Sequence, residues 1–344
     1  MKIEGIMIIY IYLGFYIQKT SEGMMESMIK LLADSTCDLS DEIIEKYSIG
    51  IAPLNIHIEV KSYKDRMDIQ PDEFYGMIDK VDGEIRTANP SPRDFLDLME
   101  ASADAGYDEI LCICMSSGTS GSYQSAEIAR EYFKDEHPES KARIHVVDSV
   151  SMSHGSGWLI MKTARLMEKG ATFEELVEFN ETHKYNVKHF LSVDDLDHLI
   201  KSGRLSNGSA IIGKMLKIKP IMTMKDKKGA IVAKERGRKN VYKHYVREFK
   251  ERIDLEMSDF IIIGYTSDIK IAENLKSLLL KETEYQGDIF IMQMGVSVGA
   301  HVGLGGLSLF FMEKDRIKDN ILRNELLLMR ERKNRIFETL KRYK

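Results

Sequence analysis

Residues 109–130 read EILCICMSSGTSGSYQSAEIAR, an apolar run that passes into a loop of serine, threonine and glycine and then into a helix-like stretch. A short buried strand, a tight polar loop and a helix form the repeating unit of α/β proteins. A helix that begins after such a loop presents unpaired backbone N–H groups, which favour an anion. This stretch therefore predicts an α/β fold and an anion-binding loop.

The composition of the loop narrows the kind of anion. No Lys or Arg occurs between residues 109 and 129, whereas a phosphate-binding P-loop needs G-x-x-x-x-G-K-[ST]. Neutral donors suit a single negative charge, such as a carboxylate, better than a polyphosphate. An ordinary capped turn with solvated serines is the alternative, because serine is common at helix starts. The hydroxyl donors available in the loop are Ser116, Ser117, Thr119, Ser120 and Ser122.

The same alternation of strands and helices fills the first half of the chain from Ile29. The strands are predicted over residues 29–33, 51–60, 109–114 and 144–147. The helices are predicted over residues 40–47, 71–78, 91–105, 122–130 and 155–169. These elements predict an N-terminal α/β domain over residues 29–185 with a doubly wound, mostly parallel sheet.

The second half has a different pattern, which predicts a second α/β domain over residues 186–316 with a mixed sheet. A turn at Lys227-Lys228-Gly229 predicts an antiparallel hairpin between residues 219–222 and 230–234. Further strands are predicted over residues 190–193, 260–265 and 289–294, and helices over residues 240–251 and 269–280.

Two terminal segments fit neither domain. Residues 6–17 form an apolar run of 12 residues, shorter than the ~20 that span a bilayer, and no small-residue cleavage site follows it. Because Met24, Met25 and Met28 lie just ahead of the first strand, we interpret residues 1–28 as an extension read from an upstream start, with a weak membrane contact as the alternative.

Residues 317–344 predict a basic amphipathic helix that packs on the protein; a dimer contact or an anionic surface is the alternative.

Composition excludes several classes of protein. The 344 residues suit two domains, and 43% hydrophobic with 30% charged residues argues against a disordered or polytopic membrane protein. The net charge of −5 gives no overall reason to bind nucleic acid. Three cysteines cannot all pair, which favours a reduced, cytoplasmic setting. Without C-x-x-C or H-x-x-x-H spacing, no metal site is predicted.

Two further loops carry polar groups. Residues 87–91 read TANPS, a turn that begins with the hydroxyl of Thr87. Residues 295–306 hold five glycines in twelve residues, which let a backbone approach a ligand closely, and His301 lies among them. His301 can donate a hydrogen bond to an anion, although a lone histidine is more often a structural hydrogen-bonder.

The glycine-rich stretch also contains a formal G-x-S-x-G match at residues 295–299, with Ser297 at its centre. A nucleophile elbow needs a helix after the serine and then an acid and a histidine. The residues after Ser297 are glycine-rich and no histidine follows His301. A serine-dependent acyl hydrolase or transferase that uses Ser297 or Ser120 is therefore the alternative function, and a nucleotide-binding module is a third.

Taken together and in chain order, six segments closely resemble the DegV family, whose members include the fatty-acid-binding subunits of bacterial fatty acid kinase. The resemblance covers roughly residues 29–316. The family usually has T-S-Q-P-S where this chain has TANPS, so one hydroxyl and one amide differ. The six segments are Asp34-Ser35-Thr36, Thr87-x-x-Pro90, the Ser116–Ala126 loop, Lys201-Ser202-Gly203-Arg204, Leu216-Lys217-Ile218-Lys219-Pro220 and His301-x-Gly303-x-Gly305-Gly306.

The resemblance implies a two-domain α/β protein that buries one long-chain fatty acid between its domains and carries no cofactor. The carboxylate-binding residues that it implies are Thr87, Ser120, Ser117, the Gly118 backbone and His301. It also implies that the protein is no enzyme: a separate ATP-dependent kinase subunit phosphorylates the presented carboxylate, and the acyl phosphate feeds phospholipid synthesis, with transient contact to a membrane surface. The candidate residues for docking that kinase are Arg204, Arg236 and Arg238.

Overall fold

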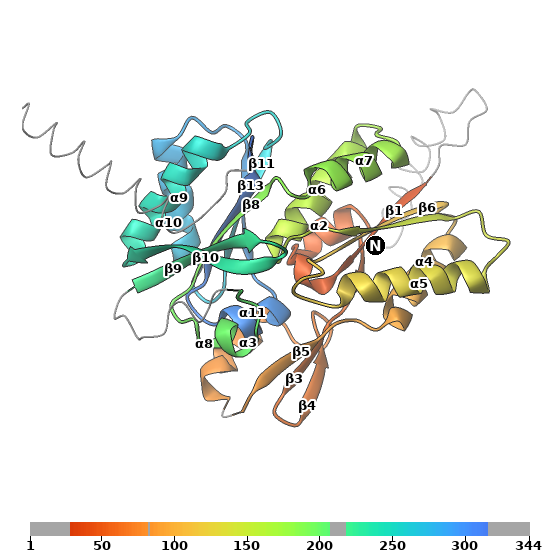
Figure 1. The fold of residues 1–344 in the computed structure, drawn as a ribbon, viewed down its shortest axis with the longest axis horizontal. Coiled ribbons are helices and arrows are strands. Elements are labelled where there is room, and N and C mark those ends of the chain that lie inside the picture. Colours follow the sequence, from red (N-terminus) through yellow and green to blue (C-terminus); the bar gives the residue numbers. More distant parts are fainter. Residues whose placement is uncertain (1–27, 82, 207–217, 316–344) are drawn as a thin grey trace, which may run out of the picture.

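The computed structural model describes residues 28–81, 83–206 and 218–315, which form three β-sheets with helices packed around them (Figure 1). Apart from Met28, the predicted extension and its apolar run lie outside these ranges, as does the predicted tail helix over residues 317–344. In the part of the chain that the structure describes, no helix is both long and apolar enough to cross a membrane.

The first sheet has four parallel strands in the order β2-β1-β6-β7. Every residue of the EILCIC strand is buried, as expected for an inner parallel strand that is covered on both faces. Helices α4 and α5 cover one face and α6 and α7 the other (Figure 1). The doubly wound sheet is therefore confirmed. Its strands are β1 (Ile29–Asp34), β2 (Gly50–Ala52), β6 (Glu109–Cys114) and β7 (Arg143–Asp148).

The helices of this half begin close to the predicted residues. Capping boxes, in which Ser91 and Asp94 or Thr172 and Glu175 exchange hydrogen bonds, fix the starts of α4 and α7. The helix α7 was not predicted. The helices are α2 (Asp41–Lys46), α3 (Pro71–Met77), α4 (Pro92–Asp104), α5 (Ser122–Glu136), α6 (His154–Glu168) and α7 (Phe173–His183), with 3₁₀ turns η1 (Ser35–Cys37) and η2 (Ile78–Lys80).

A second, three-stranded antiparallel sheet corrects the prediction of one strand over residues 51–60. The chain leaves the parallel sheet after Ala52, because Pro53 has no N–H to continue the ladder, and it enters the new sheet at Asn55. Thr87, expected in a turn, lies on a strand of this sheet, where it pairs with Ile56. The strands, in the order β4-β3-β5, are β3 (Asn55–Ile58), β4 (Lys61–Lys64) and β5 (Ile85–Ala88).

The third sheet has six strands in the order β10-β9-β8-β13-β11-β12, and all neighbours are antiparallel except β11 and β12. This confirms the mixed sheet and the hairpin. The glycine-rich stretch forms a helix that was not predicted, and the strand β13 that follows it was not predicted either. The elements are β8 (Val187–Ser192), α8 (Asp197–Lys201), β9 (Ile218–Lys225), β10 (Lys228–Arg236), α9 (Arg238–Arg252), β11 (Phe260–Tyr265), α10 (Ile269–Glu282), β12 (Asp288–Gln293), α11 (Val296–Val302) and β13 (Leu307–Met312).

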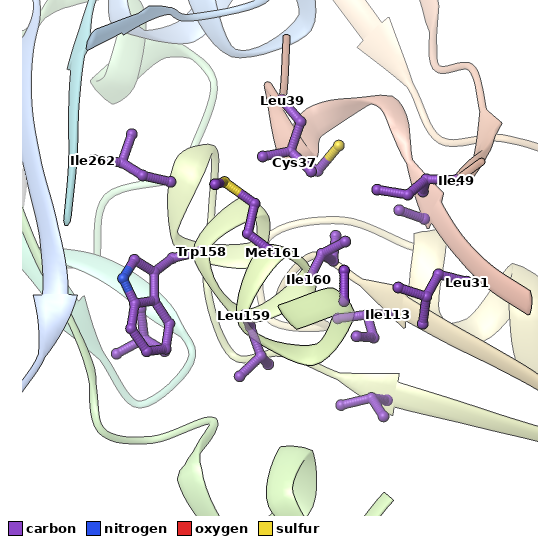
Figure 2. Packing of buried hydrophobic residues seen from close by; sticks show 14 of the residues in the cluster. Leu31, Cys37, Leu39, Ile49, Ile113, Trp158, Leu159, Ile160, Met161 and Ile262 are labelled. Carbon is purple, nitrogen blue, oxygen red and sulfur yellow. The ribbon is translucent and has the colours of Figure 1, made fainter. Parts of the chain in front are cut away.

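The helix α6 joins the two halves into one core. All of its residues from His154 to Ala164 are buried, which is typical of a helix covered on every side. Figure 2 shows Trp158 and Met161 on the side of the helix that faces Ile262 of the six-stranded sheet, and Ile160 on the side that faces Leu31 of the parallel sheet. The domain boundary near Tyr185 stays a prediction, because one hydrophobic cluster spans both sides of it.

Candidate functional site

A cavity lies between the two halves, where the ends of the parallel strands, the strand β5, the helix α11 and the hairpin β9–β10 come together. Its empty space, open solvent at the mouth included, is about 1050 Å³. Methionines supply much of its wall, and their unbranched side chains can adapt to the shape of a ligand. The apolar residues of the wall are Leu54, Met115, Met152, Leu191, Leu199, Leu205, Met222, Met224, Met294, Val298, Val302 and Phe310.

Thr87 and His301 meet at the wall of this cavity. The hydroxyl Oγ1 of Thr87 lies 2.8 Å from Nε2 of His301, a hydrogen-bonding distance. Burial, together with the nearby charge of Arg204 and His198, lowers the pKa of His301 to about 4. The imidazole is therefore neutral near neutral pH and offers one donor and one acceptor.

Ser120 reaches the same cavity from the start of α5. Its hydroxyl lies 3.0 Å from that of Ser122 and accepts a 3.3 Å hydrogen bond from the Ser122 N–H. A Cβ on Gly121 would lie 3.0 Å from Oδ1 of Asn89, whose amide nitrogen donates to Ser125 Oγ at 2.9 Å. The two polar loops that the sequence set apart by some thirty residues thus face each other.

Ser117 and Gly118 contact the tip of the hairpin and are not part of the cavity wall. Ser117 Oγ donates to Asp148 Oδ2 at 2.5 Å, and Lys227 Nζ lies 2.8 Å from the same oxygen. Ser116 Oγ donates to the carbonyl of Lys227 at 2.7 Å. A Cβ on Gly118 would lie 2.5 Å from that carbonyl oxygen, so only glycine lets the turn approach so closely. The first part of the serine loop, residues 116–118, therefore contacts the hairpin, and Ser120 in the second part lies on the cavity wall.

The three arginines predicted to dock a partner have different environments. Arg204 borders the cavity and donates to the carbonyl of Ser202 at 2.6 Å. Arg238 is held inside the fold, where it donates to Ser192 Oγ at 3.0 Å and to the carbonyl of Gly305 at 2.6 Å. Arg236 is exposed. Only Arg236 of the three presents its side chain freely to a partner.

Comparison with known proteins identifies the family. A family profile described as an uncharacterised protein of the DegV family matches residues 28–314. The chain belongs to the DegV family. A DegV domain-containing protein of Clostridium acetobutylicum is 36% identical over 288 residues, which is 83% of this chain and 99% of that protein.

Two solved structures of DegV family members share the fold. The structure of DegV from Bacillus subtilis, described as a fatty acid binding protein, matches with a TM-score of 0.71 and 26% identity, over 84% of this chain and 100% of that one. The fatty acid binding DegV family protein from Streptococcus agalactiae matches with a TM-score of 0.71 and 27% identity over the same shares.

Buried carboxylates of this DegV chain accept hydrogen bonds from residues that are distant in the sequence. Asp38 accepts hydrogen bonds from Ser153 Oγ at 2.5 Å and from the N–H of Gly295 at 2.9 Å. Burial raises the pKa of Asp38 to about 8, and the neighbouring Asp65 adds to that rise. Asp34 accepts from the N–H of Met115 at 2.8 Å. Asp34 was among the segments singled out from the sequence, but Asp38 and Asp65 were not. An isolated acidic residue gives no sign in the sequence that it is buried.

The two candidate nucleophiles lack the geometry of a serine hydrolase. Ser297 lies in the helix α11, contrary to the expected loop, and is 2% exposed. Its hydroxyl makes no hydrogen bond of normal geometry within the described part of this DegV chain. The hydroxyl of Ser120 bonds Ser122, and His301 bonds Thr87. Neither serine therefore has a histidine placed to take its proton.

Proposed function

We propose that this protein binds one long-chain fatty acid in the cavity and holds its carboxylate at Thr87, Ser120, Arg204 and His301, which we call the Thr87 cluster. The observation that carries the proposal is the 2.8 Å contact between Thr87 and His301 on the wall of a mostly apolar cavity that also contains a guanidinium. Two related DegV structures described as fatty acid binding support it.

The chemistry of the cavity fits such a ligand. Burial of ~14 methylenes at ~0.8 kcal/mol each gives roughly 11 kcal/mol before the costs of ordering and association. The hydroxyls of Thr87 and Ser120 are uncharged donors to the carboxylate, and the guanidinium of Arg204 supplies the positive charge that a carboxylate prefers. The apolar wall therefore provides most of the affinity, and the Thr87 cluster sets the position of the carboxylate.

The protein's role in this proposal is that of a carrier and not of an enzyme. A separate ATP-dependent kinase subunit phosphorylates the carboxylate, and the acyl phosphate enters phospholipid synthesis in the cytoplasm. Arg236 is the candidate docking residue for this subunit, because its side chain is exposed at the end of β10 and the exposed Lys239 follows in the first turn of α9. Because Arg204 borders the cavity, we assign it to the binding of the carboxylate and no longer to the docking of the kinase subunit.

The direct test is native mass spectrometry of the purified full chain, followed by solvent extraction of any small molecule. We expect one long-chain fatty acid per chain, and we expect delipidated protein to take up stearate in the same ratio. Protein that arrives empty and takes up neither stearate nor palmitate would contradict the proposal, and covalent labelling by a fluorophosphonate would replace it with serine chemistry.

The position of the carboxylate is tested by the double variant Thr87→Ala/Ser120→Ala. We expect a roughly tenfold to hundredfold loss of stearate affinity, because two donors to a charged group are removed. The matched control is Ser117→Ala, which removes a neighbouring hydroxyl that faces Asp148 instead of the cavity. Equal retention of stearate by the double variant and the parent would show that the carboxylate lies elsewhere.

A further inference from the structure

A second polar group lies on the wall of the cavity, on the six-stranded sheet. His189 on β8 and Ser308 on β13 both border the cavity. The two strands pair so that Phe310 lies opposite His189 and Leu191 lies opposite Ser308. Because alternate residues of a strand point to one face, these four side chains share the face that the cavity exposes. We call His189 and Ser308 the Ser308 cluster.

One polar atom of each side chain in the Ser308 cluster is buried without a partner. His189 is 7% exposed and Ser308 is 0% exposed. Among the described residues, Ser308 Oγ and His189 Nε2 have no hydrogen-bond partner. A buried polar group that lacks a partner costs about 1–3 kcal/mol, so each such group in a folded protein calls for an explanation.

The cluster is electrically neutral. Burial lowers the pKa of His189 to about 3, so its imidazole carries no charge near neutral pH. A neutral imidazole has one donor and one acceptor, and a serine hydroxyl has both functions. The Ser308 cluster therefore suits an uncharged group that can both donate and accept, and it would not compensate a second carboxylate.

Close packing fixes the two side chains in place. A Cβ on Gly155 of α6 would overlap Nε2 of His189, and a Cβ on Gly264 of β11 would overlap Oγ of Ser308. The same Cβ on Gly264 would lie 2.7 Å from Nδ1 of His154. Two glycines thus leave just enough room for these polar atoms, which makes the cluster a preorganised feature of the cavity wall.

We propose that the Ser308 cluster recognises a hydroxyl group on the acyl chain, so that the preferred ligand is a hydroxylated long-chain fatty acid. This inference rests on the proposed function, since it takes the Thr87 cluster as the carboxylate site. A plain hydrocarbon chain would leave Ser308 and His189 desolvated and unpaired. A chain hydroxyl would donate to one of them and accept from the other, and a site built in this way discriminates against analogues that lack the hydroxyl.

The experiment compares stearate with a positional series of hydroxystearates on delipidated full-length protein, by competition against a fluorescent fatty acid. We expect at least one isomer to bind about tenfold more tightly than stearate, which corresponds to one buried hydrogen bond of about 1.4 kcal/mol. If stearate binds and no isomer binds more tightly, the inference is wrong and the proposed function stands. If neither stearate nor any isomer binds, both are wrong.

Variants show whether the preference comes from this cluster. In Ser308→Ala and in His189→Phe, we expect the ratio of hydroxystearate affinity to stearate affinity to fall to about one. The matched control is Ser102→Ala, which removes a buried hydroxyl that donates to the Leu98 carbonyl within α4 and has no contact with the cavity. A ratio that stays high in both cluster variants would assign the preference to another part of the wall and overturn the inference.

Discussion

The Thr87 cluster and the Ser308 cluster face one cavity but are built in opposite ways. The members of the Thr87 cluster come from separate elements and are already hydrogen-bonded, such as Thr87 to His301 at 2.8 Å and Arg204 to the Ser202 carbonyl at 2.6 Å. The Ser308 cluster comes from two neighbouring strands and has no such bonds among the described residues.

Because of this difference in charge and hydrogen bonding, the two clusters select different chemical groups of a ligand. The Thr87 cluster includes a guanidinium, so it can hold an anion. The bond between Thr87 and His301, and the bonds of Ser120 and Arg204 to neighbouring residues, keep its side chains in place when no ligand is bound. The Ser308 cluster is neutral and unpaired, so a neutral polar group gains hydrogen bonds there that no side chain has to give up. The charged Thr87 cluster therefore fixes the position of the carboxylate, and hydrogen bonds to the neutral Ser308 cluster distinguish acyl chains of similar length.

The largest expected effect comes from breaking the Ser308 cluster with Gly155→Ala. The new methyl group would overlap the His189 ring and lie 3.2 Å from Cβ of Ser151, so we expect a loss of about 2 kcal/mol in the free energy of unfolding, measured with urea. The control is Gly76→Ala in α3, where no atom lies within 4 Å of the new methyl and a gain of about 0.5–1 kcal/mol is expected. Similar values for both would show that His189 does not pack on α6.

The next effect separates Arg204, which borders the cavity, from the exposed Arg236. Arg204→Met removes the guanidinium from the Thr87 cluster, and we expect about a tenfold weaker affinity for stearate, since a charge-assisted hydrogen bond is worth about 1.5–3 kcal/mol. Arg236→Met removes an exposed charge away from the cavity wall and should change that affinity less than twofold. Competition against a fluorescent fatty acid measures both, and the reverse order would move the carboxylate site toward Arg236.

A smaller expected effect concerns how the free energy of unfolding depends on pH, which involves one histidine from each cluster. Burial lowers the pKa of His189 to about 3 and that of His301 to about 4, below the value of about 6.5 in an unfolded chain. The stabilisation that depends on these neutral rings is complete above pH ~6.5 and is lost as the pH falls toward ~4, because the unfolded state binds protons first. We expect His189→Phe and His301→Gln each to make this loss shallower.

The measurement is the free energy of unfolding at several pH values between about 7 and 4. The raised pKa of Asp38 acts in the opposite sense, since its proton stabilises the folded state below pH ~8, but this contribution is common to all the variants. A pH profile that neither substitution alters would mean that both histidines are solvated in the folded protein.

The smallest effect concerns stability without ligand. In delipidated protein, Ser308→Ala removes an unpaired buried hydroxyl, so we expect no loss or a gain below about 1 kcal/mol. Thr87→Ala leaves His301 Nε2 without its partner, and we expect a loss of about 1 kcal/mol. Thermal unfolding of the two variants measures the difference, and a clear loss with Ser308→Ala would show that its hydroxyl is paired in the folded state.

Local sequence patterns predicted the regular elements well and their partners less well. The run of residues 109–114 and its serine loop were predicted correctly, because an uninterrupted apolar strand followed by capping residues has few alternatives. The run of residues 51–60 was predicted as one strand, yet it belongs to two sheets. A twofold alternation identifies extended backbone but does not specify which strand it pairs with.

The α/β class, the mixed second sheet and the three segments rich in polar residues or glycine could be predicted from the sequence, since periodicity, capping and glycine content are local properties of the chain. The structure was needed to show that Ser117 contacts the hairpin while Ser120 lies on the cavity wall, that Arg204 borders the cavity, and that His189 Nε2 and Ser308 Oγ are unpaired there. The physical reason is that a side chain's partners and its desolvation depend on residues far away in the chain.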